Sequence, residues 1–276
     1  MNLATLTLIL IMARAWEQAP PPPPAPAPAA ESGIADNSFL MEEAYNQDFG
    51  VVQHINTFTR SGKGEWVYTF TQEWPLPAQR HQVSYTLPVM AGGGETGVGD
   101  VALNYRYQAL DGSKGGLAVA PRLSLLIPTG SSARGLGAGG AGLQANLAAS
   151  RTLGTRVVAH SNLGTTWVPR ARNASDERAA TWGWNAGQSV VWLARPNFNA
   201  LVELVWTRSR EVVGPDRTEA SDSLLLSPGI RWAHNFASGL QIVPGVAVPI
   251  GLGPSRGDRS LLLYLSFEHP FRRARP

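Results

Sequence analysis

The stretch FNALVELVWTRS (residues 198–209) decides the fold of this chain, because its apolar and polar residues alternate. One parity carries Phe198, Ala200, Val202, Leu204 and Trp206, and the other carries Asn199, Glu203, Thr207 and Ser209. Successive side chains of a β-strand point to opposite faces of its sheet. The stretch is therefore predicted to be a long strand with one apolar face and one polar face.

Three further stretches, 66–74, 101–108 and 261–268, show the same alternation. Their apolar parities hold Trp66, Tyr68, Phe70 and Trp74, then Val101, Leu103, Tyr105 and Tyr107, then Leu261, Leu263, Leu265 and Phe267. After residue 30, no stretch shows the period of about 3.6 residues that an amphipathic helix requires. The body of the chain is predicted to be all β.

The composition excludes several classes of protein. The 276 residues are 43% hydrophobic and only 16% charged, whereas ordinary soluble proteins are about 25% charged. The chain has no cysteine, which excludes a disulfide scaffold, a zinc site built on thiolates and a cysteine nucleophile. A net charge of +3 is too small to indicate a nucleic-acid partner. The apolar run from Leu3 to Met12 is far shorter than the ~20 residues of a membrane helix.

The spacing of the alternating segments predicts a closed antiparallel transmembrane β-barrel of about 12 strands. The predicted strands are centred near residues 55, 70, 85, 104, 122, 147, 162, 188, 203, 228, 245 and 264. Membrane strands need about 9–11 residues, and those of bacterial barrels come in even numbers. The strands of a soluble sandwich are typically about 5–6 residues long, which is too short for these segments.

The predicted connections alternate in length, which gives a second and independent argument. The connections after the fourth, sixth, eighth and tenth strands are short: 111–116, 152–155, 194–197 and 234–239. Those after the third, fifth, seventh, ninth and eleventh are longer and more polar or glycine-rich: 91–97, 128–140, 169–180, 209–222 and 251–259. Outer-membrane barrels have tight turns on the periplasmic side and longer loops outside. We therefore expect a cell outer-membrane location with both termini in the periplasm.

Tryptophans support a barrel, and three prolines count against its simplest form. The tryptophans that fall toward predicted strand ends are Trp66, Trp74, Trp167, Trp182, Trp184, Trp192, Trp206 and Trp232. Tryptophan favours the boundary between water and lipid, where barrels carry aromatic girdles. Pro121, Pro228 and Pro244 fall inside predicted strands, where each removes a ladder hydrogen bond. The register near them is left open.

The two ends of the chain are predicted to lie outside the fold. Residues 1–15 have the apolar core and the small-residue site, Ala13-Arg14-Ala15, of a signal peptide. Residues 16–38 are expected to be a proline-rich periplasmic linker. The outer-membrane barrel is expected to occupy 39–271, followed by a basic C-terminal tail at 272–276.

If the apolar parity faces lipid, the polar parity lines the barrel lumen. The charged residues predicted to line it are Asp100, Arg106, Arg122, Arg156, His160, Glu203, Arg231 and Glu268. Charges of both signs neutralise one another in such an interior. About twelve strands enclose more space than eight strands and less than a porin. The pattern is equally consistent with a narrow, partly plugged passage and with a polar core that conducts nothing.

No catalytic residue, metal site or cofactor is predicted, and the chain is not expected to be an enzyme. His160 and Ser161 are adjacent on a strand, so they point to opposite faces and cannot form a nucleophile–base pair. The sequence leaves open whether Ser124 or Ser189 approaches His160 in space.

Residues 97–130 resemble a known family of outer-membrane barrels. GVGDVALNYRYQAL (97–110) places a Gly-x-Gly-Asp turn before an alternating strand, and LAVAPRLSLLIPTG (117–130) ends in a Pro-Thr-Gly turn. This pattern is similar to that of the meta-pathway of phenol degradation family, whose members are often described as transporters. The resemblance implies that residues 39–55 and 79–89 hold the first strands. The C-terminal end departs from the usual pattern, because Arg272 to Pro276 run past the last aromatic residue.

The leading hypothesis is an outer-membrane channel or transporter. The family resemblance implies that its solutes are small hydrophobic or aromatic compounds. The alternative is a structural or partner-binding barrel whose outer loops, 169–180 and 209–222, recognise a partner. A barrel lipid hydrolase that uses His160 is a weaker third hypothesis. The expected partners are outer-membrane lipid and small apolar solutes, without nucleic acid.

Overall fold

The computed structural model describes residues 34, 38–92, 94–236 and 238–270. The predicted signal peptide, all of the predicted linker except two residues, and the basic tail therefore lie outside the described residues. Among the residues that are described, no helix is long and apolar enough to cross a membrane.

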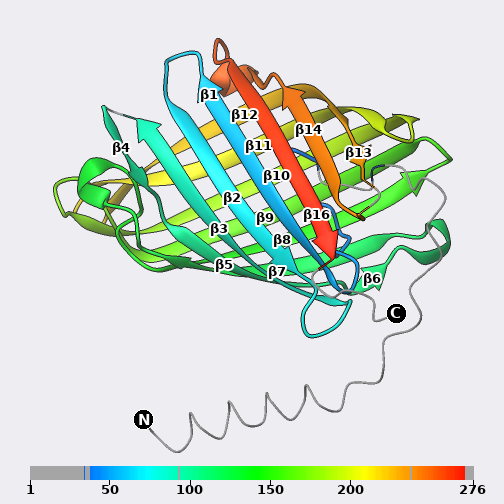
Figure 1. Ribbon diagram of the computed structural model, residues 1–276. Helices are drawn as coiled ribbons and strands as arrows, with labels where there is room; N and C mark the ends of the chain where they lie inside the picture. Colours follow the sequence, from blue (N-terminus) through cyan, green and yellow to red (C-terminus); the bar gives the residue numbers. More distant parts are fainter. Residues whose placement is uncertain (1–33, 35–37, 93, 237, 271–276) are drawn as a thin grey trace, which may run out of the picture. The chain divides into compact units, whose positions relative to one another are not determined.

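The described residues form a closed barrel of long antiparallel strands, as the sequence predicts. Around the wall the strands are β1 (Val51–Ser61), β2 (Trp66–Trp74), β3 (His81–Gly92), β5 (Val101–Tyr107), β7 (Ala118–Ile127), β8 (Gly142–Leu153), β9 (Val157–Arg172), β10 (Arg178–Arg195), β11 (Phe198–Gly214), β12 (Arg217–Trp232), β14 (Gln241–Ala247) and β16 (Ser260–Pro270). The strand β16, red in Figure 1, pairs with β1, in blue, and also with β14, which pairs with β12. These pairings close the twelve-stranded sheet on itself.

Shorter elements lie at the strand ends. They are β4 (Glu95–Val98), β6 (Leu110–Asp111), β13 (His234–Asn235) and β15 (Ile250–Gly251), with three single-turn 3₁₀ helices at Ser113–Gly115, Ser132–Arg134 and Gly253–Ser255.

The two faces of the wall follow the predicted parities. On the outward face, Leu103, Leu123 and Leu163 are 46%, 55% and 58% exposed, whereas the inward-facing Gln82 and Ser124 are buried. Such an exterior is stable against hydrocarbon and not against water. Trp182 and Trp192 lie on the outward face of β10. Their separation of ten residues spans about 25 Å on a tilted strand, which matches the apolar band of a transmembrane barrel.

The prolines Pro121, Pro228 and Pro244 lie inside strands, as predicted, in β7, β12 and β14. Two of them mark the shortest ladder of the wall. The strand β12 pairs with β14 only over Gly229–Arg231, and with β15 only over Leu225–Leu226. Between these patches a single bond runs from the Val248 N–H to the Pro228 carbonyl.

Two expectations about strand boundaries were wrong. The segment 39–55, which the resemblance assigns to the first strands, is strand only from Val51 onward, and residues 38–49 run through the interior as irregular chain. The predicted outer loops 169–180 and 209–222 are mostly strand, because β9 to β12 are 16–18 residues long. Cross-strand bonds between polar side chains hold these extensions together, as between the hydroxyls of Ser209 and Ser221 at 2.9 Å.

Candidate functional site: the plugged lumen

A segment of the chain itself fills the middle of the lumen. We call residues 38–49 the plug. Irregular backbone at membrane depth is tolerated only where other groups satisfy its N–H and C=O groups. The wall meets this requirement with inward-facing side chains that bind the plug backbone.

Glu203 and Asn162 bind the backbone of the first half of the plug. The carboxylate of Glu203 accepts hydrogen bonds from the N–H groups of Leu40, at 2.9 Å, and Met41, at 3.1 Å. The Asn162 amide makes a pair of bonds with Glu42, because its oxygen accepts from the Glu42 N–H at 2.9 Å and its nitrogen donates to the Glu42 carbonyl at 2.7 Å.

Three more wall side chains hold the second half. The Arg106 guanidinium donates to the carbonyls of Glu43 and Tyr45, at 3.2 and 2.7 Å, and to the Asn46 side chain at 3.0 Å. The hydroxyl of Ser150 accepts from the Ala44 N–H at 2.8 Å, and the side-chain oxygen of Gln82 accepts from the Gln47 N–H at 2.9 Å. Polar side chains of the lumen wall therefore form hydrogen bonds with the plug backbone along its length.

An ion pair also joins the plug to β7 of the wall. The Arg122 guanidinium donates to both carboxylate oxygens of Glu42, the shortest bond being 2.6 Å. Burial of the Glu42 carboxyl would raise its pKa, but the attraction of Arg122 and the hydrogen bonds from it outweigh that effect. The pKa of Glu42 therefore lies below its ordinary value of 4.5.

The plug separates the free space of the lumen. Glu42 borders two cavities, of 450 and 420 Å³, and the first of these also touches Thr181, near the beginning of β10. The next plug residue, Glu43, borders a third cavity, of 400 Å³, which touches Leu193 near the other end of β10. The plug thus separates the cavities that face one end of the barrel from the cavity that faces the other end.

The structure places the eight predicted lumen residues in three groups. Arg106, Arg122, His160, Glu203, Arg231 and Glu268 point inward from the strands. Asp100 lies at one end of the barrel, where its carboxylate accepts from the N–H groups of Gly130 and Ala138 at 2.9 and 2.7 Å. Arg156 is exposed in the tight turn between β8 and β9 and does not face the lumen, because β8 ends at Leu153.

The sequence did not point to Ser150 or to the plug residues themselves. The signal for the plug is the stretch FLMEEAYNQDFG (39–50), which does not alternate although it directly precedes an alternating strand.

His160 has a serine partner, but not one that the sequence suggested. Its Nδ1 atom lies 2.8 Å from the Ser150 hydroxyl, and Ser189 is directly opposite it on the neighbouring strand. Ser161 points outward and donates to the Gln188 side chain, which confirms that it cannot pair with His160. The Ser150 oxygen is already engaged by the Ala44 N–H, so in this conformation it is not presented as a nucleophile.

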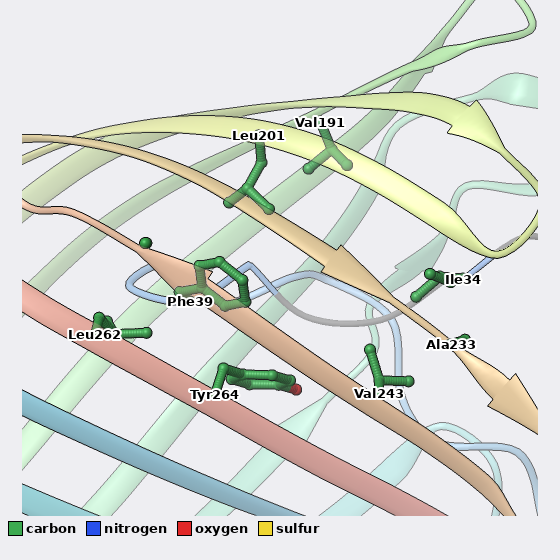
Figure 2. Close-up of a cluster of buried hydrophobic side chains, with 9 residues drawn as sticks. Ile34, Phe39, Val191, Leu201, Ala233, Val243, Leu262 and Tyr264 are labelled. Atoms are coloured by element: carbon green, nitrogen blue, oxygen red, sulfur yellow. The ribbon is translucent and has the colours of Figure 1, made fainter.

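The lumen wall also carries an apolar area that the plug covers. Figure 2 shows Phe39 and Ile34 among wall side chains from β10, β11, β14 and β16, which include Val243, Leu262 and Tyr264. The Phe39 and Tyr264 rings are 5.1 Å apart between centroids and tilted by 43°.

Comparison with known proteins identifies the fold. No family model matches the chain, and no curated protein matches it in sequence. Among solved structures, the chain is similar to the crystal structure of an outer membrane channel from Pseudomonas putida F1, with a TM-score of 0.63 and 12% identity over 82% of this chain and 98% of that one. It shares the fold of that channel. It is also similar to the NanC porin, with a TM-score of 0.54 and 9% identity over 78% of this chain and 98% of that one.

Proposed function

We propose that this chain is an outer-membrane channel for small solutes that is closed by its own plug. The observation that supports this function is the arrangement of the cavities. Adjacent plug residues, Glu42 and Glu43, border free space toward opposite ends of the barrel. Movement of a short peptide, with the wall unchanged, joins these spaces into one polar passage.

The orientation of the channel is part of the proposal. The first strand starts and the last strand ends at the same end of the barrel, because the number of strands is even. An exported chain with a leading proline-rich linker would have this end in the periplasm.

The proposed solutes are small hydrophobic or aromatic compounds. The family resemblance supports this class, and so does the apolar area of the lumen wall formed by Val191, Leu201, Val243, Leu262 and Tyr264. A wall with polar residues alone would offer such compounds no favourable contact.

Flux through proteoliposomes tests the channel. Heat-modifiable migration on a gel first shows that the purified protein is a closed barrel. We expect slow swelling with the wild type in small solutes, and faster swelling with Arg106→Ala, which releases the carbonyls of Glu43 and Tyr45. A closed barrel that admits no small solute in either form would contradict the proposal.

A second candidate, recognition of a partner, is favoured by the length of β9 to β12. These strands have 16–18 residues, while crossing the membrane takes about 9–11. Their hairpins therefore project beyond the bilayer. Deletion of residues 209–222 would abolish partner binding in that case and leave membrane insertion and solute flux intact.

A further inference from the structure

We infer that the seat of the Phe39 ring on the lumen wall is a binding site for a small solute with one aromatic ring, and that such a solute opens the channel by displacing Phe39. The inference rests on the proposed channel function and deepens it, because it assigns a site and a signal for opening. The ring of Phe39 occupies the position that the ring of the solute would take.

The seat is shaped for a ring by two glycines on adjacent strands. A Cβ atom at Gly245 would lie 2.5 Å from Cζ of Phe39, and one at Gly229 would lie 2.7 Å from Cε2. Neither glycine has a left-handed backbone, so each supplies space and not conformational freedom. Any larger residue at these positions would fill the hollow that the ring now occupies.

The walls of the seat favour an uncharged aromatic group. Tyr264 offers a ring face at 5.1 Å, and Val243 and Leu262 are buried beside it. Tilted and offset aromatic pairs gain energy beyond the burial of area, which an aliphatic ring cannot obtain.

Displacement of Phe39 weakens the attachment of the plug to the wall, because the residues on both sides of Phe39 are bound to the wall. Its neighbours Leu40 and Met41 donate to Glu203, and the Ser38 hydroxyl lies 2.6 Å from that of Ser189. The ring lies between these contacts, so it cannot leave while they persist. A solute that binds only the vacated seat must shift the equilibrium toward the released plug, in proportion to its concentration over its dissociation constant.

Two glycine substitutions separate the seat from general loosening of the plug. Gly245→Ala fills the seat, so it expels Phe39 and also excludes a solute ring. Gly187→Ala is the matched control, because its Cβ would overlap Sδ of Met41 on the same wall and leave the ring seat untouched. Both variants loosen the plug, and only the first removes the site.

The plug can be followed chemically in the full chain. Since the protein has no cysteine, Ser38→Cys introduces a single thiol at a position that is only 3% exposed. Its rate of reaction with a charged methanethiosulfonate reagent reports release of the plug. We expect benzyl alcohol to raise this rate about fivefold at a few times its dissociation constant, cyclohexylmethanol to raise it much less, and glycerol not to change it.

The variants decide the interpretation. With Gly245→Ala added, the basal rate should be high and insensitive to benzyl alcohol, whereas with Gly187→Ala it should be high and still responsive. An equal response to benzyl alcohol in both variants would mean that the alcohol acts through the lipid, and would overturn the inference.

Direct binding gives a second measurement that needs no movement of the plug. The fluorine signal of 4-fluorobenzyl alcohol should broaden with Phe39→Ala protein and not with Phe39→Ala/Gly245→Ala protein in the same micelles. Equal fluorine spectra with the two proteins would contradict the proposal that the seat binds an aromatic ring. If Arg106→Ala proteoliposomes conduct while benzyl alcohol changes nothing, the channel stands and this inference fails. If the aromatic alcohol binds and releases the plug but no variant shows solute flux, the binding site is supported and the channel function is contradicted.

Discussion

The Nη2 atom of Arg122 lies 2.6 Å from Oε1 of Glu42, so an ion pair connects the barrel wall to the plug inside the lumen. The same guanidinium donates to the side chains of Asn104, at 3.0 Å, and Gln144, at 2.8 Å. Side chains of two neighbouring strands of the wall therefore help to hold the Arg122 guanidinium in the position where it meets Glu42. Docking of Glu42 then requires little further ordering of its partner.

Substitution of Glu42→Gln should release the plug more often. The amide keeps the shape of the side chain but loses its charge, and hydrogen bonds that involve a charged group are worth about 1.5–3 kcal/mol. We expect the reaction rate of a Ser38→Cys thiol to rise about tenfold, which corresponds to roughly 1.4 kcal/mol.

The pair between Lys63 and Asp258 supplies the control for this substitution. It has a similar length of 3.0 Å but joins side chains that are 77% and 50% exposed. Exposed pairs contribute little, so Lys63→Gln should leave the thiol reaction unchanged. A rate in Glu42→Gln equal to that of the Lys63 variant would show that the Arg122 pair does not hold the plug.

Acidification should also release the plug. The pKa of Glu42 is lower in the docked plug than its ordinary value of 4.5, so the ionised carboxylate favours docking above that value. This contribution disappears as the pH falls through the lowered pKa. Solute flux or Ser38→Cys reactivity, measured with a reagent whose own rate is corrected for pH, should rise as the pH falls below the ordinary value of 4.5 and through the lowered pKa. The Glu42→Gln variant should lack this rise, and an identical acid response in both proteins would refute the assignment to Glu42.

Much of the barrel could be predicted from the sequence because each face of a strand meets one uniform environment. Leu103 and Leu263 belong to the outward-facing parities of their strands, and these parities face lipid. A period of two residues therefore identifies both the strand and which of its faces points outward. The same argument fails at strand ends. It placed Arg156 in the lumen by parity, although the strand had already ended at Leu153.

The plug could not be predicted in this way, because its contacts have no local period. Leu40 bonds to Glu203, 163 positions away, and Glu42 bonds to Asn162, 120 positions away. The parity of the strand residues predicts that Glu203 faces the lumen, but it contains no information about which peptide this carboxylate binds.

Substitution of Ser150→Ala tests whether the Ser150–His160 pair serves the plug or catalysis. The hydroxyl accepts from the buried Ala44 N–H at 2.8 Å, and an unsatisfied buried donor costs about 1–3 kcal/mol. We expect increased Ser38→Cys reactivity and no change in the amount of free fatty acid released from phospholipid vesicles. Loss of lipid hydrolysis in Ser150→Ala and in His160→Ala would instead indicate a hydrolase.

Substitution of Asp100→Asn should free the loop 128–141 without opening the barrel. The two carboxylate oxygens of Asp100 accept from Gly130 and Ala138, and an amide retains only one acceptor oxygen and turns a donor toward the other N–H. The loop contains Arg134, the last residue of a single-turn 3₁₀ helix, and a protease can cut there only after the turn unwinds. We expect trypsin to cleave after Arg134 about ten times faster in Asp100→Asn, in line with a loss of about 1–3 kcal/mol.

The control for this loop removes a different contact of the same segment. Arg134 lies 3.6 Å from Glu95, and both side chains are about half exposed, so Glu95→Gln should change the cleavage rate little. Mass spectrometry of the fragments identifies the site, and heat-modifiable migration of the cleaved protein shows whether the barrel stays closed. Because Asp100 contacts the loop and not the plug, Ser38→Cys reactivity should be the same in Asp100→Asn as in the wild type. A parallel rise in that reactivity would mean that the loop and the plug move together.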